Sequence, residues 1–173
     1  MLPYDNATVR RRDRLLDPER AEELLRGGEY GFLAMVSDRE EGGAYGVPLS
    51  YVWDGAGALY IHCAPEGRKL RCVERSPRVT FCVVGRTRVC PERFTTAYES
   101  IVVECRAVRG LDEGERMQAL GLLLEKYSPD DAEVGMRYAE KSFHRTEVVR
   151  LDILRVSGKC KVCLLYTSPS PRD

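Results

Sequence analysis

A series of short segments rich in β-branched and aromatic residues, each followed by a turn sequence, constrains the fold of this chain more than any other feature. The expected strands cover residues 30–36, 44–53, 58–63, 78–84, 100–108 and 147–156. Expected helices over residues 17–27, 65–75 and 112–127 interrupt the series without a regular strand-helix-strand repeat. We therefore predict a mainly β (α+β) fold: a closed or nearly closed barrel of about six strands, the first three in antiparallel meander order.

Two connections in this pattern carry further expectations. The segment between the strands over residues 78–84 and 100–108 is polar, so we expect it to be a loop. In the segment 112–127, Met117, Leu120, Leu124 and Tyr127 recur at three- and four-residue steps. This spacing predicts a helix that packs on the barrel through those four side chains.

Length and charge limit the classes of protein that this sequence can belong to. A chain of 173 residues is long enough for one domain and short for two, and we expect a single domain over residues 1–162.

The chain's 27 basic residues balance its 27 acidic residues, so no global charge favours nucleic acid or an anionic membrane. No apolar run approaches the roughly 20 residues of a membrane span, and the polar start lacks a signal peptide. We expect a cytoplasmic protein.

The seven cysteines do not have the spacing of a disulfide framework. Cys63, Cys82 and Cys105 lie inside apolar, strand-like runs, where a cysteine behaves as a small hydrophobic residue. We therefore expect reduced, buried thiols.

The last residues, 163–173, read CLLYTSPSPRD and resemble the translation of a transposon-type sequencing adapter. On this interpretation the domain ends near Val162 and the tail is disordered. The C-x-x-C pattern of Cys160 and Cys163 then has no value as a redox or zinc half-site, because its second cysteine comes from the adapter. A native Pro/Ser-rich disordered tail is the alternative.

The stretch over residues 60–70 is the most informative for chemistry. It runs from a strand end into a helix start, so backbone N–H groups and the positive end of a helix dipole lie where Arg68 and Lys69 also occur. This arrangement suits a phosphate, although a solvated basic turn is the alternative. His62 lies at the strand end beside this site, either as a functional group or as a hydrogen-bonded structural histidine. His144 has no such neighbours, and we expect it to be structural.

Seven short motifs, in order, make the chain resemble the nitroimidazole-resistance (Nim) branch of the pyridoxamine 5'-phosphate oxidase-like proteins. They are RDR at residues 12–14, GEYGFLA at 28–34, VPLSYV at 47–52, LYIHCA at 59–64 with EGRK at 66–69, PRV at 77–79, TAYES at 96–100 and GK at 158–159. Each motif is weak alone, but the ordered set covers nearly all of residues 10–160.

The resemblance implies a six-stranded antiparallel split β-barrel that works as a homodimer, with flavin mononucleotide (FMN) at the dimer interface. It implies that Arg68 and Lys69 hold the FMN phosphate. The residues expected to run along the flavin are Val47, Pro48, Leu49 and Ser50, together with His62, Cys63 and Ala64, with Ser100 nearby. The family commonly has a small residue soon after the position of Ser100, where this chain has Glu104 and Cys105. This departure concerns the shape of the pocket wall.

Three functions are compatible with these residues. The first is an FMN-dependent reductase of a small-molecule oxidant such as a 5-nitroimidazole, in which His62 is the catalytic residue that orients the substrate or donates a proton. The second is a haem protein with His62 as axial ligand. The third is a flavin- or deazaflavin-binding module without turnover. The sequence lacks the glycine motifs of Rossmann and Walker-type nucleotide sites, and its two distant histidines do not favour a catalytic metal.

Overall fold

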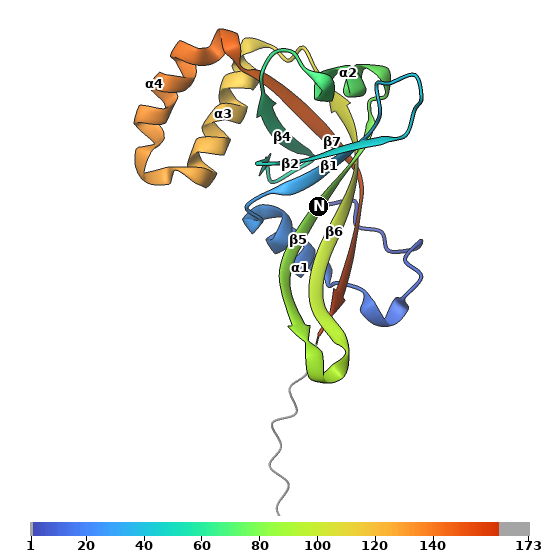
Figure 1. Ribbon diagram of the computed structural model, residues 1–173. Helices are drawn as coiled ribbons and strands as arrows, with labels where there is room; N and C mark the ends of the chain where they lie inside the picture. Colours follow the sequence, from blue (N-terminus) through green and yellow to red (C-terminus); the bar gives the residue numbers. More distant parts are fainter. Residues whose placement is uncertain (1, 163–173) are drawn as a thin grey trace, which may run out of the picture.

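The computed structural model describes residues 2–162 of the chain, so the predictions for residues 163–173 lie outside the described residues. It is a single antiparallel sheet of seven strands with four α-helices (Figure 1). The strands are β1 (Gly31–Val36), β2 (Ala44–Leu49), β3 (Val52–Trp53), β4 (Ala58–Cys63), β5 (Arg78–Cys90), β6 (Thr95–Val108) and β7 (Glu147–Lys161). The helices are α1 (Pro18–Gly27), α2 (Arg68–Arg75), α3 (Glu113–Tyr127) and α4 (Ala132–Ser142). The predicted α+β class and split-barrel architecture are confirmed.

The strand order, β2-β1-β5-β6-β7-β4-β3, corrects the predicted meander. β1 pairs with β2 and β5, whereas β4 pairs with β7 and with the two-residue β3. The expected strand over residues 44–53 is broken at Ser50 and Tyr51, which gives seven strands instead of six. The break has a physical cause, because the Tyr51 side chain is fully buried and its backbone bonds to α3 rather than to a strand.

β5 and β6 are longer than their apolar segments predicted. The expected polar loop is instead the outer half of a hairpin, in which strand pairing continues from Thr87–Tyr98 to Cys90–Thr95. A register shift after Val84 separates this polar arm from the barrel, and the arm extends below it (Figure 1). Backbone pairing alone holds such an arm together, so its side chains need no apolar pattern.

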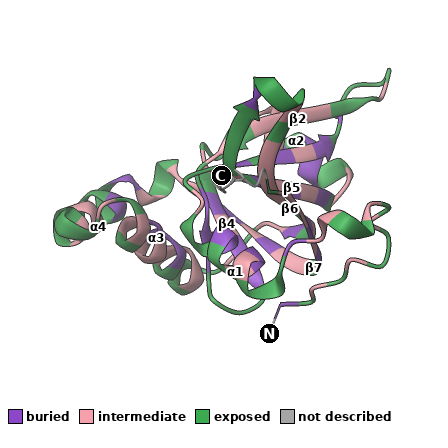
Figure 2. Cartoon of the chain, turned by 90° about the horizontal axis from the view of Figure 1, so that it is seen from below, coloured by how far each residue is buried: buried purple, intermediate pink, exposed green. Residues whose placement is uncertain are grey.

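Alternate residues of the strands are buried and fill the interior of the barrel. Figure 2 colours the buried residues purple along the strands. Fully buried members include Leu33, Leu59, Ile61, Phe81, Val83, Ile101, Val103, Val149 and Leu151. α1 adds Ala21, Leu24 and Leu25 to this core, and α2 adds Leu70, Cys72 and Val73. The six cysteines among residues 2–162 are free thiols, as expected from the sequence.

Helix α2 begins at Arg68, three residues later than predicted. Gly67 precedes it with φ of 142°, a conformation that L-residues with a side chain rarely adopt. The chain therefore turns sharply at Gly67 before the helix starts.

α3 and α4 form a helical hairpin that stands beside the barrel (Figure 1). The residues of α3 that are most deeply buried are Ala119, Leu120 and Leu123, so the buried stripe is rotated from the predicted one. Helix α4 was not predicted from the sequence. It follows a turn at Pro129–Asp131, and its buried residues are Ala139 and Ser142. None of the helices within residues 2–162 combines the length and apolar character required to cross a bilayer.

Lys126 and Tyr127 fasten the helical hairpin to the barrel at Tyr51. The single proton of the Tyr127 hydroxyl is shared between the carbonyl oxygens of Glu29 (2.6 Å) and Tyr51 (2.9 Å), and the hydroxyl accepts from the Tyr51 N–H at 3.0 Å. The Lys126 ammonium donates to the Tyr51 carbonyl at 2.9 Å and lies 3.8 Å from the centre of the Tyr51 ring. Burial without a carboxylate partner lowers the pKa of Lys126 from its ordinary 10.5 to about 8.

We expect the contribution of Lys126 to the free energy of unfolding, taken as the difference between the wild type and Lys126→Met, to rise with pH between about 8 and 10.5. Burial raises the pKa of the Cys63, Cys82 and Cys105 thiols, which therefore act in the opposite direction in both proteins. In that window the unfolded chain binds the Lys126 proton more tightly than the folded chain does. The rise should be on the order of 1 to 2 kcal/mol, since the ammonium is only half-buried. Urea unfolding at pH 7 and pH 10 measures it, and Lys126→Met should remove that part of the rise. The exposed Lys141→Met is the control, and an equal effect of both changes would contradict the assignment.

Candidate functional site

The predicted site lies where the sheet stops pairing at two of its strand ends. β2 is an edge strand that ends at Leu49, and β3 covers only part of β4, whose last residues Ile61, His62 and Cys63 pair on one side only, with β7. The β3–β4 ladder ends at the pair Val52–Tyr60, and Ser50 and His62 each lie two residues beyond it. Both residues line one cavity. The structure therefore brings together two predicted segments that are distant in the sequence.

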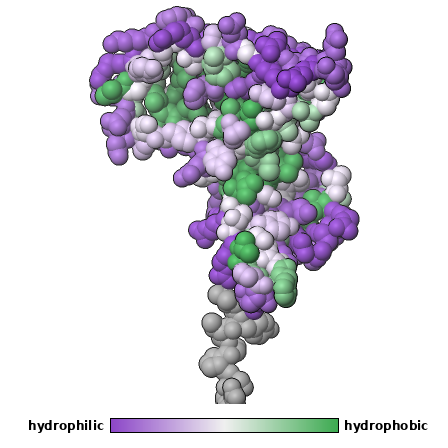
Figure 3. Space-filling model, viewed as in Figure 1, coloured by the Kyte–Doolittle hydropathy of each residue, from purple (hydrophilic) through white to green (hydrophobic). Residues whose placement is uncertain are grey.

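This cavity, of about 640 Å³, lies between the strand ends and the α3–α4 hairpin. We call it the hairpin cavity. Its walls are mostly apolar, and Figure 3 shows hydrophobic residues on the hairpin and on the barrel beside it. The lining residues are Ser50, His62, Leu120, Leu123, Leu124, Tyr127, Ser128, Asp131, Val134, Gly135, Tyr138, Ala139, Ser142 and Thr146. A large apolar cavity with a few polar groups is the usual form of a small-molecule site.

His62 presents a neutral imidazole at this cavity. One side of the residue is exposed, but partial loss of water around the ring lowers the pKa of His62, and the nearby Lys69 ammonium lowers this pKa further. At pH 7 the ring therefore has one N–H donor and one nitrogen acceptor.

Lys69 connects the strand end to the first turn of α2. Its ammonium interacts with both His62 and Cys63, the latter within hydrogen-bonding reach. Burial raises the pKa of the Cys63 thiol even though Lys69 acts in the opposite direction, so Cys63 is a neutral thiol. Lys69 has no carboxylate partner within residues 2–162.

Arg68 points the other way and is already paired. Its Nε donates to Asp38 Oδ1 at 3.0 Å, a second nitrogen donates to Ser37 Oγ at 3.2 Å, and its guanidinium lies 4.1 Å from the centre of the Tyr45 ring. Asp38 also accepts from Arg71 at 2.8 Å. These arginines lower the pKa of Asp38 to about 2, so the carboxylate stays charged.

The two predicted phosphate ligands therefore differ in their surroundings. Lys69 offers an unpaired ammonium beside the first N–H groups of α2, which have no partner within the helix. Those groups suit a phosphate. Arg68 would have to share its guanidinium between the phosphate and Asp38. The residues fit an anionic group best at Lys69.

The other predicted flavin contacts fall into two groups. Val47, Pro48 and Leu49 occupy the last residues of the edge strand β2, and Ala64 is exposed just beyond β4. These four residues belong to the two strand ends described above. Ser100 lies apart from them, on β6, with β5 and β1 between it and β2. A single chain does not bring Ser100 to His62.

Several residues of the site were not identified from the sequence. Asp38 is one, because its two arginine partners lie some thirty residues further along the chain and only folding brings them together. The others are the residues of α4 that line the cavity, such as Asp131 and Tyr138. The sequence Pro129-Asp130-Asp131 is a helix start signal that could have indicated α4.

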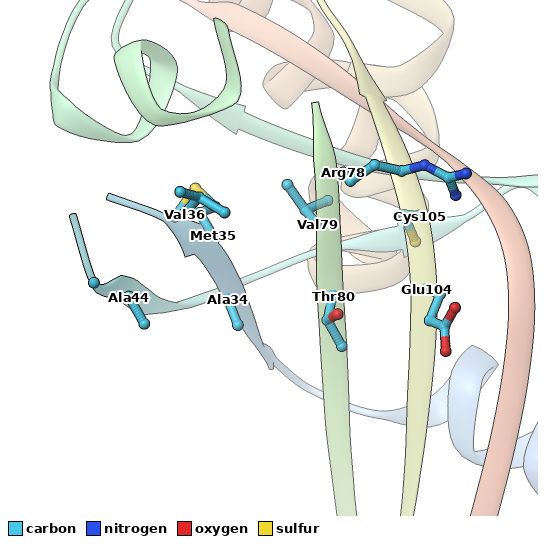
Figure 4. Close-up of a pocket in the computed structure, with 10 residues that line it drawn as sticks. Ala34, Met35, Val36, Ala44, Arg78, Val79, Thr80, Glu104 and Cys105 are labelled. Carbon is cyan, nitrogen blue, oxygen red and sulfur yellow. The ribbon is translucent and has the colours of Figure 1, made fainter. Parts of the chain in front are cut away.

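A second cavity lies at the barrel wall and contains none of the predicted site residues. It has a volume of about 350 Å³, and Figure 4 shows Ala34, Thr80 and Glu104 beside one another on β1, β5 and β6. Glu104 and Cys105, the positions at which the chain departs from the Nim pattern, both line it. The departure therefore alters this wall rather than the hairpin cavity.

Solved structures with the same fold include proteins from several bacteria. A candidate 5-nitroimidazole antibiotic resistance protein from Bacteroides thetaiotaomicron is 20% identical with a TM-score of 0.68, covering 85% of this chain and 86% of its own. The flavocytochrome Anf3 from Azotobacter vinelandii is 18% identical with a TM-score of 0.73, covering 99% of this chain and 92% of its own. An FAD and haem binding protein from Mycobacterium smegmatis is 19% identical with a TM-score of 0.63, covering 85% and 72%.

These similarities concern the fold, because the identities are low. No curated protein sequence matches the chain significantly. The family model described as pyridoxamine 5'-phosphate oxidase matches residues 17–160, which include every strand end and helix of the site. The match confirms the family-level prediction: the chain belongs to the pyridoxamine 5'-phosphate oxidase family.

Proposed function

We propose that this protein is an FMN-dependent reductase of small-molecule oxidants. The observation that carries the proposal is the continuous site formed by Lys69, His62 and the hairpin cavity. It combines an unpaired cation for a phosphate, two free strand ends for a planar ring, and an apolar space for a second molecule. The fold neighbours named for flavin binding support the same cofactor class.

The phosphate of FMN would be held by Lys69 and the first turn of α2. Charge-assisted hydrogen bonds from an ammonium are stronger than neutral ones, and the helix dipole adds to them. Arg68 is a secondary ligand in this proposal, because Asp38 already neutralises it.

The flavin ring would lie along the strand ends at Val47 to Ser50 and His62 to Ala64. Edge strands expose backbone N–H and C=O groups, which match the hydrogen-bonding edge of a flavin ring. A bound flavin supplies hydride or electron transfer, while the protein orients it and excludes competing reactions. His62 is the proposed catalytic residue, since the N–H of its neutral ring can donate a hydrogen bond that orients and polarises the acceptor as it is reduced. A 5-nitroimidazole is one such acceptor, in line with the resistance protein among the neighbours.

We also propose that the protein is a homodimer that pairs through the outer face of its sheet. Phe32, Cys82 and Val102 form one row across β1, β5 and β6 on this face. Phe32 is 46% exposed and Val84, in the next row, is 59% exposed. The Phe32 ring covers Gly46, where an added Cβ would come within 2.3 Å of it, so the face stays flat.

An exposed apolar face of this kind is typical of an interface. Ser100 lies opposite Val84 on the same face. Pairing of two copies through it would place Ser100 at their boundary, where the family resemblance puts the flavin.

A haem protein is the second candidate function. The neutral imidazole of His62 faces a cavity of about 640 Å³, and a haem ligand must be neutral to bind iron. Two fold neighbours are named as a flavocytochrome and as a haem binding protein. The lining of the cavity contains no lysine or arginine for the haem propionates, so this candidate is weaker than FMN.

The first test is the absorption spectrum of the purified protein and of the protein mixed with FMN. We expect a yellow protein whose released cofactor is FMN.

Lys69→Met should weaken FMN binding by about tenfold or more, because a charge-assisted bond contributes about 1.5 to 3 kcal/mol. Riboflavin, which lacks the phosphate, should bind the wild type and this variant equally. Arg71→Met, on the same helix and also paired with Asp38, is the matched control. Unchanged FMN affinity in Lys69→Met would refute the phosphate assignment.

Light scattering at micromolar concentration tests the dimer. Val102→Asp should give a monomer, because it buries an unpaired carboxylate in the proposed interface. Val89→Asp, on the exposed arm of β5, should remain a dimer. A wild-type monomer that binds FMN tightly would contradict the proposed interface.

His62→Ala separates the two candidate functions. If haem is the cofactor, the variant should lose the red-brown colour and the Soret band after haem is added. If FMN is the cofactor, the affinity of His62→Ala for FMN should stay within about threefold of the wild-type affinity, because the change removes no contact to the phosphate. A threefold change corresponds to less than about 0.7 kcal/mol. Reductase activity should fall in that second case.

A further inference from the structure

We propose that the hairpin cavity binds the electron acceptor, and that it selects flat apolar molecules that are neutral or cationic and rejects phosphate monoesters. The inference deepens the proposed reductase function and rests on it. It names the class of substrate, which neither the family nor the fold neighbours specify for this chain.

The walls of the cavity fit a flat apolar molecule. α3 contributes Leu120, Leu123 and Leu124, and α4 contributes Val134 and Tyr138. Val134 is 58% exposed and Tyr138 is 69% exposed, although both line the cavity. Apolar side chains at the mouth of a cavity gain free energy when a ligand covers them, by roughly 25 cal/mol for each Å² removed from water. Gly135 lets α4 pack closely on α3, because an added Cβ there would come within 2.4 Å of the Leu124 side chain.

The cavity has polar groups on the barrel side and on the hairpin side, where Ser128 and Ser142 join Asp131. Ser50 and His62 belong to the barrel side, next to the proposed flavin site, and Asp131 lies at the start of α4. The Asp131 side chain does not cap its own helix and forms no hydrogen bond or ion pair within residues 2–162. Its carboxylate is therefore available to a ligand. An acceptor bound here would contact His62 on the barrel side and Asp131 on the hairpin side.

The charge of the lining decides which ligands are accepted. Asp131 is the only carboxylate among the lining residues, and no lysine or arginine is among them. Asp131 is exposed, so its carboxylate repels an anion at the mouth of the cavity. A phosphate monoester inside the cavity would have no cation to neutralise it, and burial of an unpaired anion is unfavourable. A cationic aromatic molecule would gain an attraction of opposite charges. The cavity therefore does not suit the phosphorylated vitamin from which the family takes its name.

The nearby Lys69 does not make the hairpin cavity suitable for an anionic acceptor. Its ammonium interacts with Cys63 and His62, but Lys69 is not among the residues that line the cavity. In the proposed function this ammonium is occupied by the flavin phosphate. An anionic acceptor would have to compete with FMN for it.

Calorimetry on the FMN-loaded protein tests the substrate class with three probes. Menadione is neutral and flat, 1-methylnicotinamide is a cationic aromatic, and pyridoxine 5'-phosphate is an anion. We expect the first two to bind and the third to bind at least about tenfold more weakly than menadione, as expected for at least 1.4 kcal/mol of charge penalty. Binding of the phosphate probe as tightly as menadione would overturn the proposal.

Two changes at Asp131 and its neighbour test the charge. Asp131→Asn should weaken 1-methylnicotinamide by about fivefold, the effect of one partly exposed ion pair, and leave menadione unchanged. Asp130→Asn is the matched control, since Asp130 is adjacent and exposed but does not line the cavity. Equal effects of both changes on 1-methylnicotinamide would overturn the role of Asp131.

A change at the apolar wall tests the location. Val134→Ser combined with Tyr138→Ser should weaken menadione by about tenfold or more through lost apolar contact, with FMN content and dimer mass unchanged. A loss of FMN content would show that the flavin ring itself occupies the cavity, and a loss of the dimer would show that a second copy covers it. Either result overturns the inference about the acceptor site and leaves the proposed reductase function standing. A protein that takes up no FMN overturns the proposed function and this inference together.

Discussion

The burial of Tyr51 is the interaction on which the rest of this structure depends. Its ring lies inside the barrel, 4.9 Å from the centre of the Phe81 ring in an edge-to-face arrangement, and its hydroxyl donates to the Leu25 carbonyl at 2.6 Å. Its backbone bonds to Lys126 and Tyr127 of α3. One residue thus joins the barrel core, α1 and the helical hairpin. Because a buried hydroxyl and a buried carbonyl both need partners, these contacts fix how the three parts meet.

The break at Tyr51 also creates the site. β2 ends at Leu49 because the chain turns inward at Tyr51, and β3 begins only at Val52. Ser50 is left without strand pairing and lines the hairpin cavity together with His62. The backbone groups released at these strand ends are the ones that a planar ligand could use. The burial of Tyr51 therefore both stabilises the core and leaves the strand ends unpaired. The α3–α4 hairpin, which is bonded to Tyr51, forms the other wall of the hairpin cavity.

Electrostatics divides the site into regions of different character. Asp38 neutralises Arg68 and Arg71 on one side of α2, whereas Lys69, near His62, has no carboxylate partner within residues 2–162. The hairpin cavity is mostly apolar, and Asp131 is among its lining residues. In the proposed function, a phosphate at Lys69 and an apolar acceptor in the cavity would have separate places. This separation is what the proposed reductase requires, because its cofactor and its substrate must be bound at the same time.

The sequence by itself determined the local elements of this protein, and only the tertiary structure decided how they combine. Alternating apolar residues, turn sequences and the LYIHCA and EGRK motifs predicted the strands, α2 and the location of His62 and Lys69, because these signals act between near neighbours. The strand order, the break at Tyr51 and the pairing of Arg68 with Asp38 could not be predicted in this way. Each results from contacts between residues some thirty to ninety positions apart, whose free energy depends on burial in the finished fold. The family resemblance also implies that Ser100 lies near the flavin, whereas within one folded chain Ser100 pairs with Lys159 and His62 with Val148, far apart along β7, which only the tertiary pairing of the strands decides.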